Sequence, residues 1–178
     1  MDATETLAAL VKAARTGQRA ALEDLFRRFA PVVHGILLAR LEPADADDLT
    51  QDVFETALTR LPSLREDAAF PGWIVSIARH AALDAARRRT PLTGVAMDEV
   101  ADSADVEERV EAQRSLEAIR TLPDAYRETL LLRLVEGMTG PEIAERTGLA
   151  PGSVRVNLHR GMALLRTALS TPARGAST

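Results

Sequence analysis

Apolar side chains recur every three or four residues along most of this chain, and that spacing constrains the fold more than any other feature. Leu22, Leu25 and Phe29 illustrate a pattern that puts one apolar face along an α-helix. Runs that alternate apolar and polar residues, as a half-buried strand would, are absent from the sequence. The longest apolar stretches cover only a few residues, well short of the ~18 needed to cross a bilayer. The sequence therefore predicts an all-α protein with no membrane insertion.

The helical pattern fades between Thr90 and Glu111, and this gap divides the chain. Pro91, Gly94 and a run rich in Asp, Glu, Ser and Ala provide no usable apolar face there. The chain has 178 residues, enough for two small domains. We expect a helical domain at residues 1–90, an acidic flexible linker at 91–111, a second helical domain at 112–170 and a disordered tail at 171–178.

Charge is segregated along the chain. The net charge is −4, from 22 Lys and Arg residues against 26 Asp and Glu residues, which excludes attachment to nucleic acid through bulk positive charge. Residues 42–55 carry six acidic and no basic side chains, whereas residues 150–174 carry four arginines and no acidic residue. Such blocks indicate separate surfaces for different partners.

The residue types that usually carry catalysis or bind metals are scarce. The sequence has no cysteine, which excludes disulfides and thiolate sites, and only three histidines, scattered at His34, His80 and His159. His80 and Asp84, or His34 with nearby carboxylates, lack an accompanying nucleophile or phosphate-binding loop. We therefore expect no enzymatic activity, cofactor, metal or small-molecule substrate. The start of the chain lacks the basic segment of a secretory signal, so we expect a cytoplasmic protein.

Residues 139–154 contain the most specific local pattern. Thr139 and Glu142 have the spacing of a capping box at the start of a helix. Gly148 suits the left-handed position that ends this helix, and Pro151 suits the first position of the next one. The pattern predicts two helices joined by a tight turn, which is the helix-turn-helix arrangement of DNA-binding proteins.

The second of these helices has an apolar side and a basic side. Val154 and Leu158 would anchor it on the first helix, while arginines on the other side could contact phosphates or guanine edges in a major groove. An ordinary helical hairpin with solvated arginines is the alternative at this point. The candidate DNA-binding residues here are Ser153, Arg155, Val156, His159 and Arg160.

Two further segments carry a resemblance to a known family. Residues 70–87 read FPGWIVSIARHAALDAAR, which resembles the Phe-x-x-Trp-Leu/Ile-x-x-Ile-Ala-Arg-Asn signature in region 2 of the extracytoplasmic-function sigma factors. Residues 45–54, DADDLTQDVF, are similar to the acidic helix of the same region. Leu122 and Pro123, followed by the helix-turn-helix, resemble region 4. The resemblance covers about residues 18–90 and 112–169 in the order and spacing of the family.

The resemblance implies a promoter-specificity subunit of bacterial RNA polymerase, with core polymerase (its β′ clamp and β flap) and promoter DNA as partners. In the family, the acidic helix docks on the β′ clamp, the loop and helix after it recognise and open the −10 element, and region 4 binds the −35 element. The polymerase-binding candidates, here called the acidic ridge, are Asp45, Asp47, Asp48, Gln51, Asp52 and Glu55. The −10 candidates are Ser63, Leu64, Arg65, Phe70, Arg79, His80, Asp84, Arg87 and Arg88. We also expect an anti-sigma factor or another regulator.

The residues themselves agree with parts of this scheme. A ridge of carboxylates needs a basic partner, and DNA cannot be that partner. Trp73 lies on an apolar stripe, so we expect it in the core rather than stacked on a base. In the family, the linker runs through a basic path, which would favour the seven acidic residues found here at 98–111.

The sequence departs from the family pattern at four positions, and two other interpretations stay open. His80 stands where the family most often has Asn, and Val156, Asn157 and Met162 stand where Ser or Thr, Arg and Arg are common. These changes alter the expected base preference and weaken the expected hold on phosphates. The chain could instead be a conventional dimeric helix-turn-helix regulator that needs no polymerase, or a polymerase-binding decoy without promoter recognition.

Overall fold

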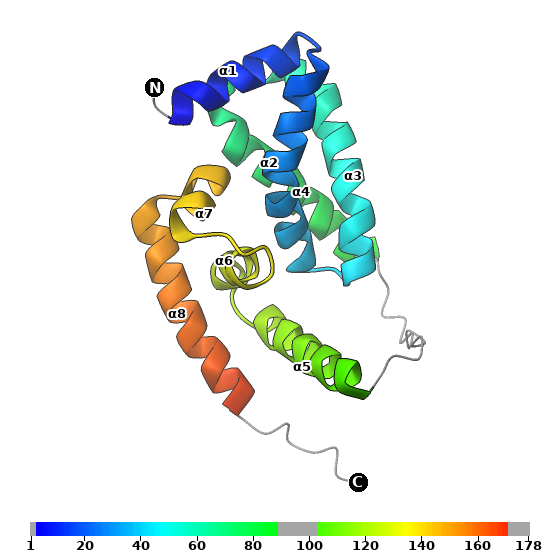
Figure 1. Ribbon diagram of the computed structural model, residues 1–178, viewed down its shortest axis with the longest axis vertical. Helices are drawn as coiled ribbons and strands as arrows, with labels where there is room; N and C mark the ends of the chain where they lie inside the picture. Colours follow the sequence, from blue (N-terminus) through cyan, green and yellow to red (C-terminus); the bar gives the residue numbers. More distant parts are fainter. Residues whose placement is uncertain (1–2, 89–102, 171–178) are drawn as a thin grey trace.

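The computed structural model describes residues 3–88 and 103–170, with side chains described at 6–88 and 110–170. All regular structure in these ranges is helical, which confirms the all-α prediction. Figure 1 shows the arrangement of the helices. They are α1 (Ala3–Arg15), α2 (Arg19–Leu38), α3 (Pro43–Arg60), α4 (Phe70–Arg88), α5 (Ser103–Arg120), α6 (Asp124–Leu134), α7 (Gly140–Thr147) and α8 (Pro151–Ser170), with short 3-10 turns η1 (Leu61–Ser63) and η2 (Asp67–Ala69) between α3 and α4.

Helix α2 forms the centre of the amino-terminal domain, which comprises α1 to α4. Helices α1, α3 and α4 all contact it, and α1 lies across the end of the bundle (Figure 1). Pro31 lies inside α2, where a proline ordinarily costs ~3 kcal/mol. The neighbouring side chains of Phe29 and Val32 are fully buried and contribute about 1.5–3 kcal/mol each. Packing therefore keeps α2 continuous through the proline.

The carboxy-terminal domain comprises α5 to α8, and its helix-turn-helix forms as predicted. At the start of α7, the backbone N–H of Thr139 donates to the Glu142 carboxylate at 2.8 Å, and the Thr139 hydroxyl accepts from the Glu142 backbone N–H. This capping bond from the Thr139 backbone lowers the pKa of Glu142. Gly148 has a φ of +74°, and Pro151 is the first residue of α8. The turn therefore has the geometry that the sequence indicated.

Helix α5 corrects the predicted extent of the linker. It begins at Ser103, so residues 103–111 are helical rather than part of a flexible connection. The segment consists largely of good helix formers, and its acidic residues lie near the helix start, where the helix dipole favours negative charge. A helix can form there without an apolar face. The remaining linker residues and the expected tail at 171–178 lie outside the described residues.

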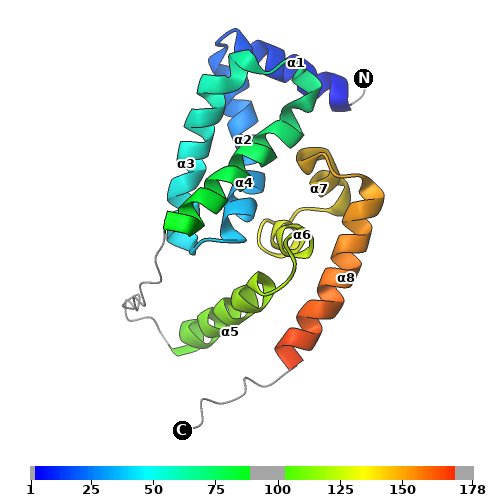
Figure 2. The ribbon, with the colours of Figure 1, turned by 180° about the vertical axis from the view of Figure 1, so that it is seen from behind.

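The two domains pack directly against each other. Helices α6 and α7 contact α2, and α7 also contacts α4, so the carboxy-terminal domain covers one side of the amino-terminal bundle (Figures 1 and 2). We call this contact the interdomain face. Within residues 3–88 and 103–170, no helix is long and apolar enough to cross a membrane.

Candidate nucleic-acid interface

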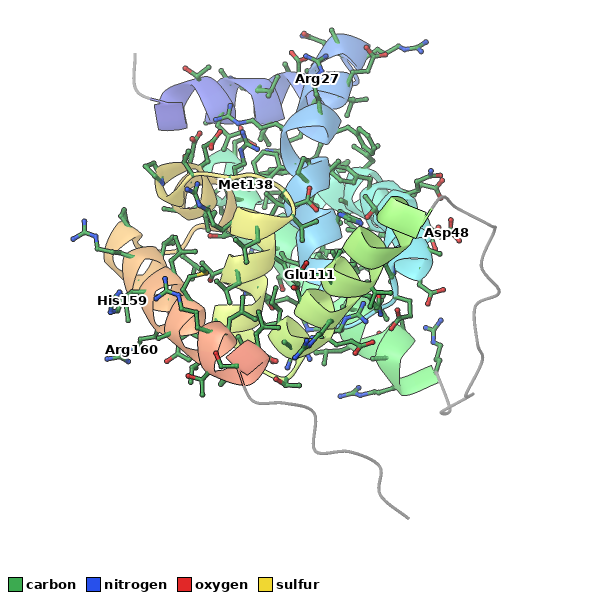
Figure 3. All side chains as sticks on the ribbon, turned by 60° about the horizontal axis from the view of Figure 1, so that its bottom comes forward. Arg27, Asp48, Glu111, Met138, His159 and Arg160 are labelled. Carbon is green, nitrogen blue, oxygen red and sulfur yellow. The ribbon has the colours of Figure 1, made fainter. Side chains whose placement is uncertain are left out.

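The acidic ridge lies along the solvent side of α3. Asp48, labelled in Figure 3, is exposed, as are four other members of the ridge, whereas Asp45 is half-buried. The opposite side of the helix is anchored in the core by Val53, Phe54 and Ala57. Helical periodicity thus separates the apolar and acidic residues of α3. The result is a rigid, negatively charged surface suited to a basic partner.

A groove of about 570 Å³ lies between α3 and α4. Asp52 of the acidic ridge lines it from α3, and His80, Asp84 and Arg88 line it from α4. Trp73 is half-buried and also lines the groove, where the sequence predicted a core position. The fold therefore places polymerase-binding and −10 candidates on the two sides of one depression.

His80 is oriented by a bond within its own helix. Its Nδ1 donates to the backbone carbonyl of Ser76 at 2.7 Å, because a carbonyl oxygen can only accept. In the neutral ring this leaves Nε2 as an acceptor for an external donor. Asp84 and Arg87, further along the same helix, are exposed and lie 3.8 Å apart. These side chains face solvent and are accessible to a nucleic acid.

Arg15 holds the segment between α3 and α4 against α1. Its guanidinium forms an ion pair with Asp67 at 2.8 Å and donates to the backbone carbonyl of Pro62 at 3.4 Å. The two contacts lie on either side of Ser63 and Arg65, which are both exposed. Sequence reasoning missed Arg15, because nothing in the pattern of α1 indicates that its last turn meets this loop.

Two of the predicted −10 contacts are core residues. Phe70 is only 2% exposed, and its ring meets Phe29 edge-on with the ring centroids 5.0 Å apart. Leu64 is 7% exposed. Side chains buried this deeply present no surface to a base, and Phe70 instead packs α4 on α2 through Phe29. We therefore remove both residues from the set of DNA contacts.

Arg79, another −10 candidate, is bound by the other domain. Its Nε donates to the carboxylate of Glu128 in α6 at 3.0 Å, and its Nη2 does so at 2.7 Å. Glu128 is 8% exposed, an unusual position for a charged side chain without a partner. In the sequence, Glu128 is recognisable only as a carboxylate next to the apolar run at residues 130–132. Its partner, Arg79, is set by the packing of the two domains and not by the local sequence pattern.

The outer side of α8 faces solvent. Val156 is 44% exposed, and His159 and Arg160 project from the ribbon into solvent in Figure 3. Ser153 and Arg155 are exposed as well. All five predicted −35 residues therefore lie at the surface of this helix.

Two departures from the family pattern contribute to contacts inside the carboxy-terminal domain. The amide of Asn157 donates to the Thr129 hydroxyl of α6 at 3.5 Å. Met162 is half-buried against the core. Where the family resemblance led us to expect arginine, this chain thus has an amide that bonds to α6 and a methionine that packs against the core. We expect fewer phosphate contacts as a consequence.

Comparison with known proteins identifies the class. The family described as Sigma-70 region 2 matches residues 25–91, and the family described as Sigma-70, region 4 matches residues 113–165. The first match covers most of α2 with α3 and α4, and the second covers most of the domain that holds the helix-turn-helix. The fold and the paired regions therefore define a sigma factor, a DNA-binding factor that directs transcription initiation with RNA polymerase.

Relatives that match over most of their length show to which group of sigma factors the chain belongs. The ECF RNA polymerase sigma factor ShbA of Streptomyces griseus is 33% identical over 183 residues, covering 93% of this chain and 96% of ShbA. The RNA polymerase sigma factor CarQ of Myxococcus xanthus is 33% identical, covering 87% of this chain and 92% of CarQ. This chain belongs to the extracytoplasmic-function sigma factors.

A solved structure shares the fold. The structure of CnrH in complex with the cytosolic domain of CnrY matches with a TM-score of 0.63 and 24% sequence identity, covering 94% of this chain and 99% of that chain. At this identity the match shows that the arrangement of helices is alike.

Proposed function

We propose that the acidic ridge of α3 docks this sigma subunit on the β′ clamp of core RNA polymerase. Asp48, Asp52 and Glu55 are exposed, and no Lys or Arg of the described ranges forms an ion pair with them. These three carboxylates stay solvated in the free chain and gain a partner when a basic surface arrives, so docking through them breaks no ion pair of the described ranges. Asp47, which pairs with His34 at 3.3 Å, is a ridge member that would exchange a partner on docking. Rigid anchoring of α3 on its apolar side further reduces the entropy lost on binding.

We propose that the groove between α3 and α4, with the loop before α4, receives the unpaired −10 strand. Arg65, His80, Arg87 and Arg88 offer exposed donors, and His80 Nε2 adds an acceptor. Unstacking a base costs a few kcal/mol, and capture of each extruded base returns about 1–3 kcal/mol. Melting would then be driven by trapping bases in this depression, and Asp84 would discriminate among bases rather than attract phosphate.

We propose that α8 enters the major groove at the −35 element. The observation that supports this is the exposure of its basic side, whereas Val154 and Leu165 on its apolar side are buried and α8 packs on α6 and α7. Arg155 and Arg160 would contact phosphates or guanine edges, and Val156 the methyl group of thymine. A dimeric regulator would use the same helix, but it would leave the acidic ridge without a role.

The net charge of the chain explains why it would need polymerase in order to bind promoter DNA. With a net charge of −4, the free chain should hold DNA weakly. Polymerase would cover the acidic ridge and fix the distance between the two DNA-binding surfaces, which then act together through their effective concentration. We infer that the protein acts by binding rather than by catalysis, in the cytoplasm with polymerase and promoter DNA. CnrH is seen with the cytosolic domain of CnrY, and we propose that an anti-sigma factor or similar protein regulates this chain too.

The experiment combines the purified chain with core polymerase and fragmented genomic DNA, followed by sequencing of the transcripts. We expect start sites that share two upstream motifs and that require the chain. Asp48→Arg should abolish assembly with core polymerase, whereas the matched control Asp24→Arg, an exposed acidic position on α2, should not. Normal assembly of Asp48→Arg would reject docking through the acidic ridge.

A further inference from the structure

His34 of α2 lies between two carboxylates that come from different parts of the chain. Its Nδ1 is 2.5 Å from an oxygen of Glu136, in the turn between α6 and α7, and its Nε2 is 3.3 Å from an oxygen of Asp47, near the start of α3. Asp47 belongs to the acidic ridge, and α2 and α3 lie side by side (Figure 1). The bond to Glu136 exists in the arrangement in which the two domains pack along the interdomain face, here called the closed state.

The two contacts together favour the protonated ring of His34. An ionised carboxylate can only accept hydrogen bonds, and a neutral imidazole carries a proton on one nitrogen only. A neutral His34 can therefore donate to Glu136 or to Asp47 but not to both, and its second nitrogen then directs a lone pair at a negative oxygen. The imidazolium form donates at both positions, so the geometry suits a charged ring.

Charge and burial act in opposite directions on His34. The hydrogen bond to Glu136 is the largest cause that raises the pKa of His34, burial lowers it, and the charges of Glu136 and Asp47 raise it further. In the described part of the chain, these two carboxylates are the charged groups that face the ring. Because the net change is upward, more chains carry this proton at neutral pH than for an ordinary histidine.

The two carboxylates differ in how easily another protein can reach them. The side chain of Glu136 is 14% exposed and that of His34 is 24% exposed, whereas that of Asp47 is 74% exposed. A Lys or Arg of an approaching partner can thus take the Asp47 carboxylate without competing for the enclosed Glu136. Once Asp47 is neutralised, the Nε2 of His34 has lost its acceptor and a cation lies nearby. Both changes favour the neutral ring.

We propose that His34 is a positioning residue that couples polymerase docking to the release of a proton. In the free chain, the Nε2 proton of His34 holds Asp47. A basic surface that docks on the acidic ridge displaces this bond, and the Nε2 proton leaves to solvent. The inference rests on the proposed docking through the acidic ridge.

The proton released on docking fixes the direction of the pH dependence. Affinity for polymerase is highest at a pH where His34 is neutral both with and without polymerase. It falls through the range in which only the free chain holds the proton, and it becomes constant once the complex holds the proton as well. Because an ion pair with one exposed member is weak, we expect a total loss of about three- to fivefold.

The test is isothermal titration calorimetry of the full chain with core polymerase near neutral pH, repeated in buffers with different heats of ionisation. The dependence of the binding heat on the buffer counts the protons released. We expect the wild type to release a fraction of one proton more than His34→Gln, whose amide can bond to a carboxylate but does not titrate. The wild type should also lose affinity on acidification relative to His34→Gln, which corrects for groups that titrate on polymerase.

Two further variants distinguish proton release from a purely structural role of His34. Glu136→Gln leaves the acidic ridge intact but removes the main support for the ring proton, so the loss of affinity should move to lower pH. Asp47→Asn should weaken docking at every pH and reduce the proton release. The matched control is Glu23→Gln, an exposed carboxylate of the same helix that pairs with Arg19. Its affinity and proton release should match those of the wild type.

The outcomes separate this inference from the proposed function. Equal proton release by the wild type and a folded His34→Gln would overturn the role of His34, even where docking through the acidic ridge is intact. Far-ultraviolet circular dichroism checks the fold of His34→Gln. If that variant is unfolded, Glu136→Gln decides, because its proton release near neutral pH must fall below that of the wild type. Polymerase binding that Asp48→Arg leaves unchanged would instead refute docking through the acidic ridge.

Discussion

The two domains present their proposed DNA-binding residues in different ways. In the carboxy-terminal domain one helix, α8, carries all five candidates on its exposed side. In the amino-terminal domain the candidates are distributed over a loop and α4, beside a groove whose other wall is α3. Arg79 is paired with the other domain, and Phe70 and Leu64 are buried. A surface that binds duplex DNA can thus be formed by a single helix. A surface that binds unpaired bases depends on several helices and loops and on the contacts between them.

The largest expected effect tests whether Phe70 belongs to the core. Phe70→Ala should destabilise the amino-terminal domain by about 3–5 kcal/mol, because it removes a buried ring and leaves a cavity. Chemical denaturation measures this change. Leu83→Ala is the control, since Leu83 is an exposed apolar residue of the same helix. Unchanged stability together with impaired promoter melting would return Phe70 to the DNA-binding surface.

The next effect concerns the free side of α8. Arg160→Ala should weaken binding to a −35 duplex by about 1–3 kcal/mol, or roughly 5- to 160-fold, with a smaller salt dependence if the lost contact was to phosphate. Titration of holoenzyme at several salt concentrations measures both quantities. Arg166→Ala, an exposed arginine on the same helix but on another side, should have little effect. Equal losses in the two variants would show that charge, rather than the position of Arg160, determines binding.

A smaller effect concerns the loop before α4. Arg15→Ala removes an ion pair between partly exposed side chains, so global stability should fall by less than ~1 kcal/mol. Promoter opening should fall several-fold more than polymerase binding, because the loop loses its attachment to α1. Permanganate footprinting of unpaired thymines measures opening. Arg19→Ala, which breaks the surface pair with Glu23, is the control, and identical behaviour of both variants would remove the positioning role of Arg15.

The smallest effect is a pH dependence of the interdomain face. The Glu136 bond and the nearby charge of Asp47 raise the pKa of His34 against the opposing effect of burial. Protonated His34 therefore stabilises the closed state fully below its ordinary pKa of about 6.5, and this contribution is lost as pH rises through the raised value. The radius of gyration should increase gradually over that window. His34→Gln should show no such change, and a wild-type radius that is constant across the window would contradict the prediction.

The comparison of the two domains also explains which predictions succeeded. The Thr139 cap, the left-handed Gly148 and the start of α8 at Pro151 each follow from short-range backbone chemistry, and all three are confirmed. Phe70 was misjudged because an aromatic residue beside a basic helix has the same local pattern whether it packs inward or faces DNA. The start of α5 was missed because helix propensity, and not an apolar stripe, decides it.

The sequence by itself determined most of the helices, the helix-turn-helix and the acidic side of α3, since periodicity and capping act within a few residues. Only the tertiary structure decided that Arg15 holds the loop, that Leu132 meets Gly35 and that Glu128 binds Arg79. These partners lie far apart in the chain, and no local energy term selects one carboxylate for one arginine. For Glu128 and Arg79 the pairing follows from burial, which brings the distant charges together and then requires the Glu128 carboxylate to be neutralised.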